Sequence, residues 1–204
     1  MKILNLYAGI GGNRKLWGDE HEITAVEHLP EIAKIYQDFF PGDKVIVADA
    51  HQYLLDHFQE FDFIWSSPPC PSHSKIRRFT SVESGQVKPI YPDMKLYEEI
   101  IFLQSYFKGM WCVENVIAYY QPLITPQEID SHYYWTNFLI RPLKKKSREH
   151  NATMDKLSER KGFNLDKYSG VDKRKILRNC VEPEVGKHII DLAINPIQLQ
   201  KTLI

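Results

Sequence analysis

The chain has 204 residues, 43% of them hydrophobic, and its 26 lysines and arginines balance 26 aspartates and glutamates. This length suits one well-buried domain. The balanced charge excludes a global positive field, so any nucleic-acid contact must rest on local clusters. Three widely spaced cysteines without a CxxC pair argue against disulfides and metal sites. With no long apolar segment, the sequence predicts a cytoplasmic protein that enters no membrane.

Short apolar runs alternate with helical patterns along the chain. Strands are predicted at residues 3–7, 23–26, 45–48, 61–65 and 110–114, and helices at residues 30–40 and 96–107. In the second helix the acidic Glu98 and Glu99 fall on a different face from the apolar positions. This alternation predicts an α/β fold, a mostly parallel sheet with helices on both faces. Ligands of such sheets bind beyond the carboxyl ends of the strands.

The segment after the fourth strand, SSPPCPSHS at residues 66–74, carries a single cysteine on a turn. Two consecutive prolines fix φ and remove two backbone donors, so the segment must turn away from the sheet. We therefore predict that Cys70 is presented rather than packed, and that Lys75, Arg77 and Arg78 give it an electropositive setting. The alternative is a buried cysteine that acts as a small hydrophobe.

Polar or glycine residues follow the other predicted strands. The glycine turn at residues 8–12 would let the backbone approach a ligand, although a tight strand-to-helix connection explains it equally well. Glu27 suits a hydrogen bond to a ribose diol, and Asp49 could accept from an exocyclic amine. Either acid could instead cap a helix. Together with Cys70 and Glu114, these residues are predicted to converge on one cleft.

Two stretches lack a regular pattern. Residues 72–93 are polar and contain a glycine and several basic residues, which predicts a mobile loop beside Cys70. Residues 141–175 are strongly charged and poor in periodic apolar positions, which predicts a small excursion or a poorly ordered insert.

Four motifs together resemble one family. LNLYAGIGG at residues 4–12, PPC at 68–70 and ENV at 114–116 are similar, in order and spacing, to the cofactor loop, nucleophile motif and glutamate motif of the cytosine C5 DNA methyltransferases. NCVEPEVG at residues 179–186 resembles the family's carboxy-terminal motif, which returns to complete the cofactor pocket. The resemblance implies a Rossmann-like S-adenosylmethionine-dependent methyltransferase fold. It divides the chain into a catalytic core (1–140), a small basic insert in place of a target-recognition domain (141–177) and a returning segment (178–204).

The resemblance also implies a mechanism and a site. Cys70 would attack C6 of a cytosine flipped out of duplex DNA, Glu114 would bond to the ring, and C5 would take the methyl group of S-adenosylmethionine, with residues 72–93 as a lid. Implied cofactor-binding residues are Tyr7, Ala8, Gly9, Gly11, Gly12, Glu27, His28, Asp49, Ala50, Pro68, Asn179 and Val181. Implied substrate-binding residues are Pro69, Ser72, Ser74, Asn115, Lys144, Lys145 and Lys146.

The chain departs from the family pattern at two positions. Pro71 follows the cysteine, where the family commonly has glutamine. In DSHYYWTN at residues 130–137, which resembles the family's arginine motif, His132 takes the place of the second arginine. The resemblance therefore makes His132 a catalytic candidate that donates one hydrogen bond, with activity rising at lower pH. The alternative is a core strand that happens to carry a histidine.

The third departure is size, because only a short stretch separates Asn137 from Arg178, where the family usually inserts a recognition domain. Its cations can grip phosphates but cannot read a sequence; they are Lys144, Lys145, Lys146, Arg148, Arg160, Lys161, Lys173 and Arg174. We therefore expect short or relaxed specificity, or a separate specificity subunit. RNA or a free cytosine nucleotide remains an alternative substrate, and a non-catalytic cofactor-binding subunit an alternative function.

Overall fold

A single sheet of seven strands forms the centre of the molecule. The structure is a computed structural model and describes residues 1–143 and 152–195. The strand order is β3-β2-β1-β4-β5-β7-β6, with β7 antiparallel to both of its neighbours and the first five strands parallel. The strands are β1 (Lys2–Leu6), β2 (Glu22–Glu27), β3 (Lys44–Val47), β4 (Phe63–Ser66), β5 (Met110–Val116), β6 (Gln127–Ile129) and β7 (His132–Thr136). The predicted mostly parallel sheet is confirmed.

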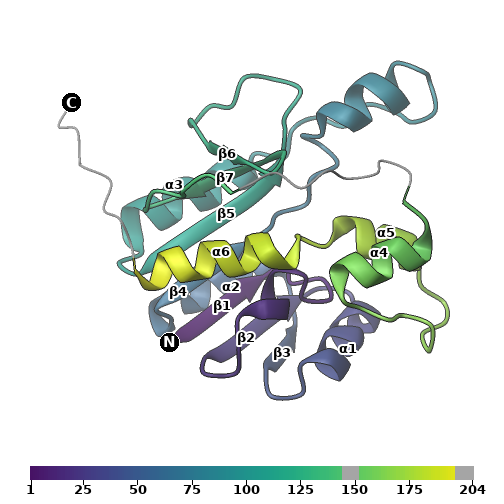
Figure 1. Cartoon of the computed structure of the whole chain (residues 1–204). Coiled ribbons are helices and arrows are strands. Elements are labelled where there is room, and N and C mark those ends of the chain that lie inside the picture. The colour runs from purple at the N-terminus through teal and green to yellow at the C-terminus, as the bar shows by residue number, and fades with distance from the viewer. Residues whose placement is uncertain (144–151, 196–204) are drawn as a thin grey trace.

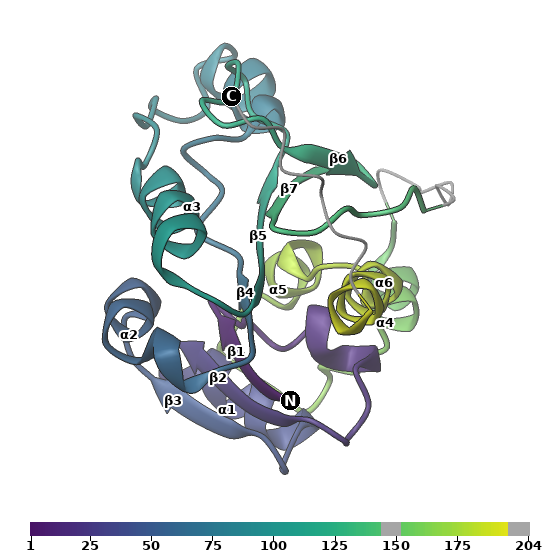
Figure 2. The same ribbon diagram turned by 90° about the vertical axis from the view of Figure 1, so that its left-hand side faces the viewer.

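Helices cover both faces of this sheet (Figures 1 and 2). Leu4, Leu6 and Ile64 point to the face covered by α2 (Ala50–His57) and α3 (Lys95–Tyr106). Ile3 and Ile23 point to the opposite face, which is covered by α6 (Pro183–Ile194). Alternation along each strand thus feeds two separate apolar layers, as expected for a sheet buried on both sides.

The first helix, α1 (Pro30–Phe39), begins where the sequence predicts. Proline occupies its first turn, where a missing N–H costs nothing. Ala33, Ile35 and Tyr36 are buried, and the helix lies on the same face of the sheet as α6. The two predicted helices and five predicted strands all exist, with ends shifted by one or two residues.

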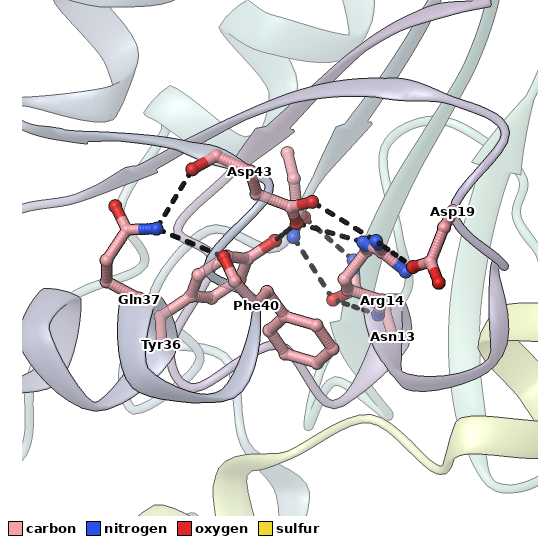
Figure 3. A network of polar contacts seen from close by, with 8 residues as sticks. Asn13, Arg14, Asp19, Tyr36, Gln37, Phe40 and Asp43 are labelled. Carbon is pink, nitrogen blue, oxygen red and sulfur yellow. Dashed lines mark hydrogen bonds and ion pairs between the residues drawn. The ribbon is translucent and has the colours of Figure 1, made fainter.

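The short helix η1 (Asn13–Leu16) follows the glycine turn and is anchored by a buried ion pair (Figure 3). The Arg14 guanidinium donates to both carboxylate oxygens of Asp43, at 2.9 and 3.1 Å, and the Tyr36 hydroxyl donates to the same carboxylate at 2.8 Å. Arg14 and Asp43 are only 4% and 7% exposed. Breaking such a pair strands a buried charge, so it holds the end of the glycine turn against α1.

Residues 152–179 are packed against the core. The prediction of a poorly ordered insert is therefore wrong for this part of the chain. They form α4 (Met154–Lys161) and α5 (Lys173–Asn179), which lie beside α1 (Figure 1). Phe163 is fully buried and meets Phe39 with ring centroids 4.9 Å apart. The pattern failed because Phe163 lies in the loop between the two helices, where no helical periodicity marks it. Lys144, Lys145 and Lys146 lie outside the described residues.

Residues 72–93 are also less free than predicted. The Lys75 amide donates to the Ile117 carbonyl at 3.0 Å, and the Tyr119 amide donates to the His73 carbonyl at 3.1 Å. The backbone then forms η3 (Arg77–Val82), a short π-helix. The stretch is therefore fixed at its start to the segment that follows β5, and only its outer part, residues 83–91, is wholly exposed.

No helix within the described ranges is long and apolar enough to cross a membrane.

Candidate active site

The turn that carries Cys70 is held by hydrogen bonds on both sides. The amides of His73 and Ser74 donate to the Cys70 carbonyl at 3.0 and 3.1 Å. On the other side, the Asn115 side chain donates to the Pro68 carbonyl at 3.0 Å, and its own oxygen accepts from the Val116 amide. Asn115 is 2% exposed. Asn115, a predicted substrate-binding residue, thus connects the end of β5 to the turn through hydrogen bonds.

Cys70 is half-buried, which corrects the expectation of a presented thiol in an electropositive setting. Burial, together with the nearby Glu114 carboxylate, raises the pKa of Cys70 to about 11. Lys75, Arg77 and Arg78 are not among the causes of this shift. The thiol is therefore protonated at neutral pH, and forming the nucleophilic thiolate requires a proton acceptor or a new positive charge nearby.

Glu114 and His132 come together across the pairing of β5 with β7. Glu114 lies opposite Tyr134, and His132 lies opposite Val116, so the two side chains are diagonal neighbours on one face. His132 Nε2 lies 3.8 Å from Glu114 Oε1. Its Nδ1 lies 3.3 Å from the Asp130 carbonyl, to which it donates. This fixes the tautomer, so Nε2 can donate to a substrate only when the ring is protonated.

A cavity of about 240 Å³, here named the polar cavity, surrounds this pair. One wall comes from the sheet and the β6–β7 turn, and the other from α4, α5 and the segment that leads into α6. Six of its members received no functional role from the sequence, namely Asp130, Tyr134, Leu157, Arg178, Cys180 and Glu182. The lining residues are Glu114, Asp130, His132, Tyr134, Leu157, Arg160, Lys161, Arg178, Cys180, Val181 and Glu182.

A second pocket of about 210 Å³, here named the amino-terminal pocket, lies at the carboxyl ends of β1, β3 and β4. It brings together six residues predicted from the sequence: Tyr7, His28, Asp49, Ala50, Pro68 and Pro69. The structure adds His73, Asp93, Lys95 and Leu96. Asp49 also caps α2, since its side chain accepts from the Gln52 amide at 2.9 Å, while its role toward a ligand stays a prediction.

Glu27 lies behind the glycine turn, at the end of β2. One carboxylate oxygen accepts from the Gly9 amide and the other from the Leu29 amide, each at 3.0 Å. His28 Nδ1 lies 3.0 Å from the same carboxylate. Glu27 is 6% exposed. It therefore ties the glycine turn to the end of β2.

The glycines of the turn serve different purposes. Gly9 has a φ of +55°, and a Cβ added there would meet nothing within 4 Å, so its outer side is open to a ligand. A Cβ at Gly11 would come within 2.4 Å of the Phe40 ring, and one at Gly12 within 2.7 Å of the Val181 carbonyl. Gly11 and Gly12 are thus packing glycines, and their predicted role in cofactor binding stays a prediction.

The carboxy-terminal segment returns to the core, as expected, but meets Gly12 rather than the amino-terminal pocket. Val181 lines the polar cavity. Asn179 is exposed at the end of α5 and lines neither pocket. Ala8 is buried, and its amide donates to the Val26 carbonyl at 3.0 Å. None of these residues has its side chain in the amino-terminal pocket.

Glu99 was expected on a polar helix face, and this is wrong, because it is fully buried. Its carboxylate accepts from the Tyr7 and Ser66 hydroxyls, each at 2.6 Å, and lies 3.0 Å from His51 Nδ1. Hydrogen bonding to Glu99 raises the pKa of His51. Tyr7 has a φ of +54°, which a non-glycine residue adopts only under constraint. Glu99 on α3 thus holds a strained residue of the amino-terminal pocket in place.

The two serines that follow Cys70 have structural partners. Ser72 Oγ accepts from the Asp93 amide at 3.2 Å, and Ser74 Oγ accepts from the Arg77 amide at 3.1 Å. His73 is 1% exposed, with Nδ1 2.5 Å from the Tyr120 hydroxyl, and burial lowers its pKa. These contacts close the base of residues 72–93 onto the sheet beside the amino-terminal pocket.

The fold is shared with a methyltransferase of known structure. The structure of an Entamoeba histolytica methyltransferase, EhMeth, superimposes with a TM-score of 0.60 at 10% identity, over 96% of this chain and 98% of that chain. The chain therefore has the Rossmann-like methyltransferase fold. A DNMT2 mutant from Spodoptera frugiperda is 25% identical over 56% of this chain and 35% of that one, with a TM-score of 0.40. A putative DNA modification methyltransferase from an E. coli prophage is 14% identical over 78% of this chain and 54% of that one, with a TM-score of 0.47.

A family model matches the amino-terminal part of the sequence. Residues 1–100 match the model of the C-5 cytosine-specific DNA methylases. This range contains the glycine turn, Glu27, Asp49 and the Pro-Pro-Cys turn, but neither Glu114 nor His132. A search of curated proteins finds no match.

Proposed function

We propose that this protein transfers a methyl group from S-adenosylmethionine to C5 of cytosine in DNA, through a covalent bond between Cys70 and C6. One observation carries the proposal: the turn that lines the amino-terminal pocket also carries a cysteine close to Glu114. Pro68 and Pro69 line that pocket, and the Glu114 carboxylate, which lines the polar cavity, raises the pKa of Cys70, the next residue. A methyl donor on one side and a base on the other would thus meet at the thiol.

The residues present fit S-adenosylmethionine. The open side of Gly9 gives the backbone of the glycine turn room to approach a ligand, and Asp49 presents a carboxylate at the end of β3. Tyr7, Ala50 and Pro68 supply the remaining walls. When bound, the cofactor supplies an electrophilic methyl group. We infer that Glu27 contributes by holding Gly9 in position, with direct contact to a ribose as an additional role.

The polar cavity suits the chemistry on the base. The Cys70 thiol gives its proton to a general base as its sulfur bonds to C6, which moves the ring electrons toward C5. Glu114, as a hydrogen-bond partner of N3 and the exocyclic amine, stabilises the charge that develops on the ring. After C5 is methylated, loss of the C5 proton returns the electrons and breaks the bond between C6 and sulfur, which frees Cys70. A duplex cytosine must first be flipped out, at a cost of a few kcal/mol.

The test is adduct formation with a duplex that contains 5-fluorocytosine, which traps the covalent intermediate because fluorine cannot leave C5 as a proton does. We expect wild type to form the adduct and Cys70→Ala to form none, with methyl transfer abolished. Cys112→Ala, which removes a thiol from the core, is the matched control and should retain the adduct. Adduct formation by Cys70→Ala would refute the proposal, and its absence in wild type on every substrate would favour the non-catalytic subunit.

The substrate class requires a separate comparison. The small size of the segment between β7 and α5 motivates RNA or a free cytosine nucleotide as the alternative. Methyl incorporation into duplex DNA, transfer RNA and deoxycytidine monophosphate should be highest for duplex DNA. Base-resolution mapping on mixed-sequence DNA should then show methylation in a short or relaxed context. A long, strict context with the isolated protein would contradict this expectation.

A further inference from the structure

The two walls of the polar cavity carry opposite charge. The wall that includes β5 and β7 contributes the carboxylates of Glu114 and Asp130. The other wall contributes three cations, Arg160 and Lys161 from α4 and Arg178 from α5, against a single carboxylate, Glu182. The cavity is therefore polarised, with excess positive charge on the helical side and negative charge on the side of the sheet.

Glu182 neutralises part of the helical wall. The Lys161 ammonium lies 2.7 Å from Glu182 and donates to the Cys180 carbonyl at 2.5 Å. Lys161 is 3% exposed, and burial lowers its pKa while Glu182 opposes that shift. Lys161 is thus occupied inside the protein, which corrects its predicted role in gripping phosphates. Arg160 Nε lies 3.4 Å from the same carboxylate but makes no hydrogen bond.

Arg178 differs from both of these cations. It is exposed at the end of α5, and within the described ranges its guanidinium has no carboxylate partner. With one carboxylate shared between Arg160 and Lys161, Arg178 leaves the helical wall with an uncompensated charge. A guanidinium binds phosphate oxygens in pairs and keeps its charge at every physiological pH.

We propose that Arg178, supported by Arg160, binds the phosphate of the flipped nucleotide whose base meets Glu114 and His132. This inference rests on the proposed function for the identity of the base. The unit formed by α4 and α5 then fixes one nucleotide through its charge rather than reading a sequence. The cavity of about 240 Å³ suits a single pyrimidine nucleotide. The α4–α5 unit therefore positions that nucleotide without a domain that fills the DNA groove.

The experiment combines a protein change with a change in the DNA. Binding is measured for a labelled duplex with one target cytosine and for the same duplex in which a neutral methylphosphonate replaces the phosphate on the 5′ or the 3′ side of the target. Arg178→Gln should weaken binding of the normal duplex about 10- to 100-fold, the range of one charge-assisted contact. Lys175→Gln, an exposed cation on the same helix that lines no cavity, should change it less than about threefold.

The inference requires non-additivity. One of the two methylphosphonates should weaken wild-type binding by a factor similar to that of Arg178→Gln. The same methylphosphonate should not weaken the binding of Arg178→Gln any further, because that variant has already lost the contact with this phosphate. Full additivity on both sides, or equal losses for Arg178→Gln and Lys175→Gln, would overturn it. Because binding is the readout, the result is independent of methyl transfer. A wild type that binds with this coupling but never methylates cytosine would refute the proposed function and keep the phosphate site.

Discussion

The amino-terminal pocket and the polar cavity are built in contrasting ways. The amino-terminal pocket is assembled largely from the carboxyl ends of β1, β3 and β4, which parallel pairing places along one edge of the sheet. The polar cavity joins the end of β5 to antiparallel β7 and to helices that follow much later in the chain. The parallel sheet thus places the strand ends that form much of the first pocket, whereas the second depends on where the α4–α5 unit docks.

The two regions also differ in how their charges are held. Glu99 lies beneath the amino-terminal pocket and is satisfied by two hydroxyls and a histidine. Cations in the polar cavity share one carboxylate, and Arg178 has no partner among the described residues. A fully satisfied network is typical of a rigid, preorganised pocket, while unbalanced charge is typical of a surface that receives a charged partner.

The largest effect is expected from Phe163→Ala, which should destabilise the fold by about 3–5 kcal/mol through loss of a buried ring. The cavity left would loosen α4 and α5 and with them the helical wall of the polar cavity. DNA affinity should therefore fall more than affinity for S-adenosylhomocysteine. Phe107→Ala, on the opposite face of the sheet, is the control and should destabilise without this selectivity. Equal losses of both affinities would show that the regions are not separable.

Glu114→Gln should lower methyl transfer by about 100-fold or more, the usual cost of removing one group that stabilises a charged transition state. The same change should act on Cys70 in the opposite direction, because it removes a negative charge that raises the pKa of the thiol. In wild type, alkylation of Cys70 by iodoacetamide should rise with pH, with a midpoint near the pKa of about 11. In Glu114→Gln the midpoint should lie lower. An unchanged midpoint would show that Glu114 does not raise the pKa of the Cys70 thiol.

Glu99→Gln should cost about 1–3 kcal/mol of stability, because Tyr7, Ser66 and His51 lose a charged acceptor. Affinity for S-adenosylhomocysteine should fall through the displaced Tyr7, while DNA binding stays near wild type. Glu98→Gln, which removes an exposed carboxylate from the same helix, is the control.

The same network predicts a pH dependence. Since the folded-state pKa of His51 is raised, its contribution to stability is complete below about pH 6.5 and is lost as the pH rises through the folded-state value. Thermal unfolding should show this loss in wild type and a smaller one in Glu99→Gln. If the stability of wild type and of Glu99→Gln fell equally with rising pH, Glu99 would not be the cause of the pH dependence.

The smallest change is expected from His132→Arg. A permanently charged guanidinium replaces a ring whose Nε2 donates only when protonated, so methyl transfer above neutral pH should be preserved or rise within a few fold. A large loss in His132→Arg would mean that this side chain does not serve in place of the family arginine.

The sequence by itself determined the local pattern and its consequences. Alternating apolar runs predicted the strands, and the motifs around Gly9, Cys70 and Glu114 predicted a methyltransferase, because these features depend on residues that are close along the chain. Only the tertiary structure decided what lies beside them. Glu99 reads as a polar helix position until Tyr7 and Ser66 are placed above it, and Arg178 reads as one more surface cation until α5 brings it to the cavity of Glu114. Burial and charge compensation are properties of neighbours in space, which spacing along the chain does not encode.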